Sequence, residues 1–280
     1  MEIISVWGSP SSGKTTLSIE IGKMIADQAH NCLVIFTDDL VGPINYLFPS
    51  ADEIGGSLGD VLMNSTTVQN DIFRSLLSFS DHKYLSFSGY RKNQSRHNFS
   101  EISDTQINDF FVSLSQNIEY VIVDCKSDFI DDPISKYALN EGTCIQVGGG
   151  DYKSISYFQN CQNHIHGYEG ILNRNTIIVN NPWDFDCWMT IADQYGGDVK
   201  YCFPFCMEIL ENYLEEKSLS VLKENKKTKA YINELNLLVN ALIGQDDMKV
   251  KKRTKKEKPK KEKKKSSIFK KKSKGDDEHE

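Results

Sequence analysis

One segment near the start of the chain combines the residue types that bind phosphate. Residues 8–15 read Gly-Ser-Pro-Ser-Ser-Gly-Lys-Thr, which matches the phosphate-loop spacing of Gly, four residues, Gly, Lys, then Ser or Thr. The two glycines allow the backbone to curl with its N–H groups facing inward, and the helix that follows adds its positive N-terminal end. We expect Lys14 to reach the β- and γ-phosphates and Thr15 to bind Mg²⁺ through its hydroxyl. The predicted nucleotide contacts are Gly8, Ser9, Pro10, Ser11, Ser12, Gly13, Lys14, Thr15 and Thr16.

Carboxylates at the ends of two apolar runs are candidates for metal binding and for orienting water. Tyr120–Val123 is followed by Asp124, a pattern that places a carboxylate near Mg²⁺ in nucleotide-binding proteins. The run Cys32–Phe36 ends at Thr37-Asp38-Asp39. In a parallel sheet the carboxyl ends of the strands face the ligand, so one of this pair could position the attacking water or hold Mg²⁺, or simply cap a turn.

Short apolar runs alternate with helical patterns along the first 245 residues. This alternation predicts an α/β domain, residues 1–245, with a mostly parallel central sheet flanked by helices. The expected strands are Ile3–Trp7, Cys32–Phe36, Tyr84–Ser88, Tyr120–Val123, Cys144–Val147, Thr176–Val179 and Val199–Phe203. The expected helices are Thr15–Gln28, Leu58–Met63, Asn70–Ser78, Asp104–Ser115, Tyr152–Gln162, Trp183–Gln194, Met207–Glu216 and Ala230–Ile243.

Two details of this pattern are more local. Gly42, Pro43 and Pro49 predict irregular chain after the second strand. The last helix has an apolar side expected to consist of Ile232, Leu235, Leu237, Leu238 and Leu242.

The overall charge of −6 conceals a basic tail on an acidic body. Lys249–Lys274 contains 16 Lys and Arg against 2 Glu, whereas residues 1–248 contain 17 basic and 33 acidic residues. This composition predicts that residues 246–280 are disordered and that Lys249–Lys274 could bind an anionic surface, either DNA or membrane lipid. No apolar run approaches 18 residues and no signal peptide is evident, so we expect a cytoplasmic protein, peripheral at the membrane or nucleoid if the tail binds there.

Together these segments resemble the ParA/MinD family of partitioning and positioning ATPases. The segments that carry the resemblance are the phosphate loop, Leu33–Asp38, Gly59–Leu62, Glu119–Cys125, Ile177–Asn180 and Phe203–Phe205. The resemblance implies a phosphate-loop NTPase fold that binds ATP and Mg²⁺. It also implies that Asp38 is catalytic beside Lys14 and Asp124, that Asn180 reads the base and that Pro204 lies beside the adenine.

One departure from the family concerns Ser9. The family usually has a second lysine five residues before the phosphate-loop lysine, and it crosses a dimer interface to the partner's nucleotide. Ser9 occupies that position here, which places the nucleotide-dependent homodimer in question. After Asp124 the chain continues Cys-Lys-Ser-Asp, in which Lys126 could supply positive charge.

Three functions are compatible with these residues. The first is an ATP-hydrolysing switch in positioning, partition, or assembly of a pilus, secretion or conjugation apparatus. The second is a nucleotide-binding adaptor or scaffold with little hydrolysis, which the missing lysine motivates. The third is a phosphate-loop kinase, for which Arg91 and Arg96 are the available lid-like arginines. The absence of a guanine-specific Asn-Lys-x-Asp motif favours ATP over GTP.

Overall fold

The central strands of the sheet are buried on both faces. The computed structural model describes residues 1–49, 56–63, 69–99, 101–164, 171, 175–180, 195 and 198–244. Its strands are β1 (Glu2–Gly8), β2 (Cys32–Phe36), β3 (Leu77–Ser78), β4 (Leu85–Gly89), β5 (Tyr120–Asp124), β6 (Thr143–Gly149), β7 (Asn175–Asn180) and β8 (Val199–Phe203). Every residue of β2 is buried, as continuous apolar runs predict for strands covered on both sides.

The eight strands form one sheet in the order β3-β4-β2-β5-β1-β6-β7-β8. All neighbours pair in parallel except β3, which is antiparallel to β4. The strand that leads into the phosphate loop, β1, therefore lies between β5 and β6 near the middle of the sheet. The predicted α/β class with a mostly parallel sheet is confirmed.

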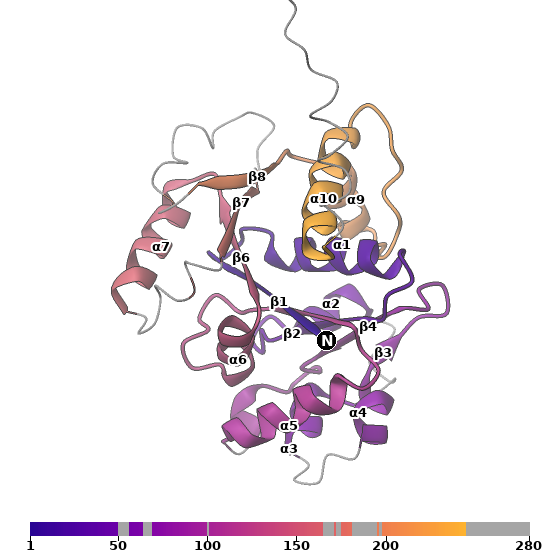
Figure 1. Ribbon diagram of the computed structural model, residues 1–280, viewed down its shortest axis with the longest axis vertical. Helices are drawn as coiled ribbons and strands as arrows, with labels where there is room; N and C mark the ends of the chain where they lie inside the picture. Colours follow the sequence, from indigo (N-terminus) through magenta and orange to yellow (C-terminus); the bar gives the residue numbers. More distant parts are fainter. Residues whose placement is uncertain are drawn as a thin grey trace, which may run out of the picture. The chain divides into compact units, whose positions relative to one another are not determined.

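Helices cover both faces of this sheet (Figure 1). They are α1 (Lys14–Ala26), α2 (Pro43–Leu47), α3 (Leu58–Met63), α4 (Gln69–Ser75), α5 (Asp104–Leu114), α6 (Pro133–Glu141), α7 (Tyr152–His164), α9 (Met207–Leu214) and α10 (Lys229–Leu242), with a short 3-10 helix η2 (Arg96–Asn98). Figure 1 shows α1, α9 and α10 on one side of the sheet and α3, α4 and α5 on the other.

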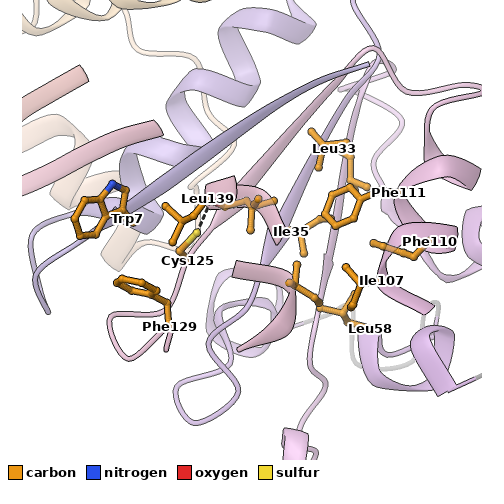
Figure 2. Packing of buried hydrophobic residues seen from close by; sticks show 14 of the residues in the cluster. Trp7, Leu33, Ile35, Leu58, Ile107, Phe110, Phe111, Cys125, Phe129 and Leu139 are labelled. Carbon is orange, nitrogen blue, oxygen red and sulfur yellow. Dashed lines mark hydrogen bonds between the residues drawn. The ribbon is translucent and has the colours of Figure 1, made fainter. Parts of the chain in front are cut away.

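Alternation along the strands divides the core into two clusters. Val6 and Val34 face the cluster that contains α1 and α10, through residues such as Leu17 and Leu238. Their chain neighbours face the opposite cluster, where Trp7, Leu33 and Ile35 pack with side chains of α3, α5 and α6 (Figure 2). The first of these clusters therefore packs the phosphate-loop helix α1 against the centre of the sheet.

Three local predictions from the sequence are wrong. The helix expected to continue through Ser78 ends at Ser75, because Leu77–Ser78 extends and pairs with β4. The region around Pro43 is not irregular but forms α2, with Pro43 in the first turn, where its missing N–H has no helical partner to lose. Leu237 is exposed, since the buried face of α10 runs through Tyr231, Leu235, Leu238 and Val239.

Two further predictions concern residues outside the described part of the chain. They are the helix Trp183–Gln194 and the Lys-rich tail. Residues Met1–Ile243 form one compact unit. Among the described residues, no helix combines the length and apolar character needed to cross a bilayer.

Candidate nucleotide-binding site

The phosphate loop has backbone angles that require its glycines. Gly8 and Gly13 have φ values of 151° and 86°, in the region that side chains disfavour. A Cβ on Gly8 would lie 2.0 Å from the carbonyl oxygen of Val147 on the neighbouring strand β6. The loop can therefore leave β1 in this direction only because residue 8 has no side chain.

Lys14 lies at the base of this loop. Its Nζ donates to the carbonyl oxygen of Ser9 at 3.0 Å and to Ser127 Oγ at 2.8 Å. Burial lowers the pKa of Lys14, whereas Asp124 and Asp38 oppose that shift. A phosphate group would supply the negative charge that a buried ammonium favours.

Thr15 and Asp124 form the closest link between the loop and the neighbouring strand β5. The Thr15 hydroxyl donates to Asp124 Oδ2 at 2.6 Å. Asp124 is 3% exposed, and its Oδ1 makes no hydrogen bond to any described residue. Burial raises the pKa of Asp124 to about 6, although Thr15, Lys14 and Ser18 favour the ionised form. A hydroxyl beside a buried, incompletely satisfied carboxylate fits the oxygen-rich environment that Mg²⁺ prefers.

Asp38 and Asp39 extend the acidic edge of the site from the end of β2. Asp38 Oδ1 accepts from the backbone N–H groups of Leu40 and Val41 at 3.0 and 2.9 Å, which fixes the turn after the strand. Asp39 is more buried, and its Oδ1 lies 3.6 Å from Lys126 Nζ. The two carboxylates therefore have different environments, with Asp38 half-buried at the surface and Asp39 paired within the site.

Ser9 points away from the surface. Its side chain is fully buried, and its Oγ lies 2.7 Å from Ser154 Oγ on α7. Ser154 Oγ also accepts from the Gly149 N–H at 2.9 Å. Ser9 thus joins the phosphate loop to β6 and α7 instead of projecting toward a partner.

Lys14, Thr15, Asp38, Asp39 and Asp124 line one pocket of about 860 Å³. Its lining includes Pro10, Ser11, Gly13, Lys14, Thr15 and Thr16 from the loop and helix, and Asp38, Asp39 and Asp124 from the strand ends. Gly8, Ser9 and Ser12, also predicted as nucleotide contacts, belong to the loop but do not line the pocket. Ser9 and Ser12 are buried, and Ser12 Oγ donates to the Ser9 carbonyl oxygen at 2.8 Å. A pocket of this size with a phosphate loop at its floor suits a nucleotide.

Comparison with known proteins places this geometry in a known fold. No protein-family profile and no curated protein sequence matches the chain. Similar solved structures include the septum site-determining protein MinD of Pyrococcus horikoshii in complex with Mg-ADP, with a TM-score of 0.65 and 16% identity over 87% of this chain and 97% of that one. A ParA family ATPase from Chlorobium tepidum gives a TM-score of 0.62 at 12% identity, over 84% and 97% of the two chains. A plasmid partition protein from Borrelia burgdorferi bound to AMPPNP, described as putative, gives a TM-score of 0.61 at 13% identity, over 86% of this chain and 100% of that one.

This chain has the MinD/ParA fold. The resemblance seen in the sequence is confirmed at the level of the fold. Of the two residues predicted to lie beside the base in a MinD/ParA fold, Pro204 lines the pocket. Asn180 ends β7, in register with Gly149 and Phe203, and its side chain lies outside the described part of the structure.

The pocket also contains aromatic residues that the sequence did not identify. Tyr46 on α2 and Tyr213 on α9 both line it, with ring centroids 5.8 Å apart. Burial raises the pKa of both hydroxyls. No local motif marks either residue, because their proximity is produced only when α2 and α9 meet at the pocket.

Proposed function

We propose that this protein binds ATP with Mg²⁺ on the Gly8–Thr15 loop and hydrolyses it as a nucleotide-dependent switch in positioning, partition or assembly of a cellular apparatus. The observation that carries the proposal is the contact between Thr15 and Asp124, together with Asp124 Oδ1, which is buried and makes no hydrogen bond to any residue that the structure describes. The fold shared with structures described as bound to Mg-ADP and AMPPNP supports an adenine nucleotide as the ligand.

Each residue of the site has a distinct part in this proposal. Thr15 and Asp124 would hold Mg²⁺, which when bound neutralises phosphate charge. Lys14 would exchange its contacts with Ser9 and Ser127 for phosphate oxygens. Asp38 would orient the attacking water from the acidic edge of the pocket.

Phosphate release measures the hydrolytic part of this proposal. The Asp38→Ala variant should release phosphate at least about 10-fold more slowly than the wild type, since water positioning and proton transfer contribute factors of this order or more. The control is Asp109→Ala, which removes an exposed carboxylate of α5 that does not line the pocket. Equal rates for the wild type and Asp38→Ala would remove Asp38 from the mechanism.

A second candidate function is a nucleotide-binding adaptor with little hydrolysis. It is favoured by the buried position of Ser9, which leaves no lysine there to reach across a dimer. Strong stimulation of turnover by DNA, anionic vesicles or a protein partner would count against it. Sizing the protein with and without ATP and Mg²⁺ gives an independent test, because the switch predicts a nucleotide-dependent homodimer and the adaptor a constant monomer.

For the tail we propose an anionic surface as its ligand. Lys249–Lys274 is the only long basic segment of the sequence, and like charges of this density favour DNA or acidic lipid. Sedimentation with vesicles containing anionic lipid, and gel shift with duplex DNA, distinguish the two. The full chain should bind one of them in a salt-dependent manner, and a chain ending at Gly244 should bind neither.

A further inference from the structure

The described part of the nucleotide pocket contains more acidic than basic groups. Its lining includes four carboxylates, Asp38, Asp39, Asp124 and Asp128, but only two ammonium groups, Lys14 and Lys126. A polyphosphate brings further negative charge into this space. Mg²⁺ and both lysines are therefore needed to offset the repulsion.

The two lysines are held differently. The Lys14 ammonium makes two hydrogen bonds, to the Ser9 carbonyl oxygen and to Ser127 Oγ, at the floor of the pocket. Lys126 makes an ion pair with Asp39 at 3.6 Å, which is longer than a hydrogen bond, and its side chain is 18% exposed. An ammonium has three donors, so Lys126 can turn toward an incoming anion.

The backbone of Lys126 is fixed even though its ammonium is loosely held. Its N–H donates to Thr37 Oγ1 at 2.9 Å, and Thr37 Oγ1 donates to the Asp124 carbonyl oxygen at 3.2 Å. The preceding residue, Cys125, donates its N–H to the Val6 carbonyl oxygen at 2.9 Å. Lys126 is therefore anchored to the ends of β1, β2 and β5, the three strands that carry the phosphate loop and the carboxylates.

The position of Lys126 indicates which part of the nucleotide it would contact. Lys126 adjoins Ser127, the partner of Lys14, and pairs with Asp39 at the acidic edge, whereas Pro204 lines the same pocket from the segment after β8. Since a phosphate-loop lysine reaches the β- and γ-phosphates, an ammonium near it on the acidic side is placed for the terminal phosphate.

We propose that Lys126 binds the terminal phosphate of the nucleoside triphosphate within the same chain, exchanging Asp39 for a phosphate oxygen. This inference rests on the proposed function, since it assigns a further residue to that site. Lys126 would then supply, from the same chain, a positive charge for the phosphates that the buried Ser9 cannot supply. The exchange also makes triphosphate binding differ from diphosphate binding, because only the triphosphate reaches Lys126.

Calorimetric titration with Mg-AMPPNP and with Mg-ADP tests the assignment without requiring turnover. Lys126→Gln should weaken AMPPNP binding about 10-fold, as expected for one charge-assisted hydrogen bond, and change ADP binding less than about 2-fold. Lys126→Arg should keep most of the difference in affinity between AMPPNP and ADP. The matched control is Lys136→Gln, which removes an exposed lysine of α6 outside the pocket.

A second variant keeps the test informative if Lys126→Gln does not fold. Asp39→Asn removes the competing carboxylate and should tighten AMPPNP binding about 3-fold with ADP binding unchanged. Equal effects on both nucleotides, in either variant, would overturn the assignment while leaving nucleotide binding intact. Failure of the wild type to bind either nucleotide would instead overturn the proposed function.

Discussion

Ser9 and Ser154 hold the phosphate loop and α7 together through hydroxyl oxygens 2.7 Å apart. Both side chains are buried. The position at which the resembling family has an intersubunit lysine is therefore a structural contact in this chain. A lysine cannot be restored there without displacing α7 or the loop.

Substitution of Ser9 by Lys should accordingly reduce stability and should not increase hydrolysis. Overpacking and burial of an ammonium should lower the free energy of unfolding by about 2 kcal/mol or more, measured by urea titration. Ser11→Lys, on the exposed part of the same loop, is the control and should change stability little. A stable Ser9→Lys variant with faster turnover would show that the position faces a partner.

Replacement of Asp124 by Asn should stabilise the nucleotide-free protein in a pH-dependent manner. Burial raises the pKa of Asp124 from 3.8 to about 6, so above pH 6 the folded state contains an ionised carboxylate that it disfavours. The resulting loss of folding stability is absent below the pKa that Asp124 has in the unfolded chain, and it is complete above the pKa that Asp124 has in the folded protein. It corresponds to about 3 kcal/mol at 1.4 kcal/mol per pKa unit.

Urea titrations at pH 7.5 and pH 4.5 measure this difference. The gain in free energy of unfolding of Asp124→Asn over the wild type should be large at the higher pH and should fall by more than half at the lower pH. The variant should also lose Mg²⁺-dependent nucleotide binding. Asp128→Asn, with an exposed side chain, should show no such change. An advantage independent of pH would contradict the assigned cause.

Removal of the Lys23 ammonium should leave the buried Glu20 carboxylate without its ion-pair partner. Lys23 Nζ lies 2.6 Å from Glu20 Oε1 and donates to the carbonyl oxygens of Ser218 and Ser220, so it joins α1 to the connection between α9 and α10. Burial raises the pKa of Glu20, and Lys23 opposes that shift. Lys23→Met should therefore lower the free energy of unfolding by about 3 kcal/mol at pH 7, with a smaller loss at acidic pH, where Glu20 is protonated. The surface pair of Lys217 with Glu215 provides the control, because Lys217→Met should cost less than about 1 kcal/mol.

Gly8 and Gly149 provide a matched comparison within the same part of the sheet. Alanine at position 8 would place its Cβ against the Val147 carbonyl oxygen, whereas a Cβ on Gly149 would approach no atom closer than 3.5 Å. Gly8→Ala should lower the free energy of unfolding by about 2 kcal/mol or more and weaken nucleotide binding. Gly149→Ala should do neither, as measured by urea titration and calorimetry.

The sequence predicts most strands of the sheet because the central ones are apolar on both faces. β2, α3 and β8 begin and end at the predicted residues, and the phosphate loop and Asp124 meet as their motifs require. Helix α6 was missed, although Asp132 followed by Pro133 is a typical helix start and the Asp132 side chain caps the helix.

Other features depend on contacts that no local pattern encodes. Leu77 and Ser78 continue a helical pattern, but pairing with β4 overrides it. The partnership of Ser9 with Ser154 and that of Lys126 with Asp39 arise only from the order of strands in the sheet. The sequence could therefore identify the phosphate loop but not which neighbouring side chains complete its pocket.

Nucleotide binding by wild type and Lys14→Met tests the central claim most directly. Calorimetric titration with Mg-AMPPNP should give a saturable one-site isotherm for the wild type, and the variant, shown to be folded by circular dichroism, should bind about 100-fold more weakly because charge-assisted phosphate contacts are lost. No binding by the wild type, or equal binding by the two proteins, would contradict the assignment of Gly8–Thr15 as the nucleotide site.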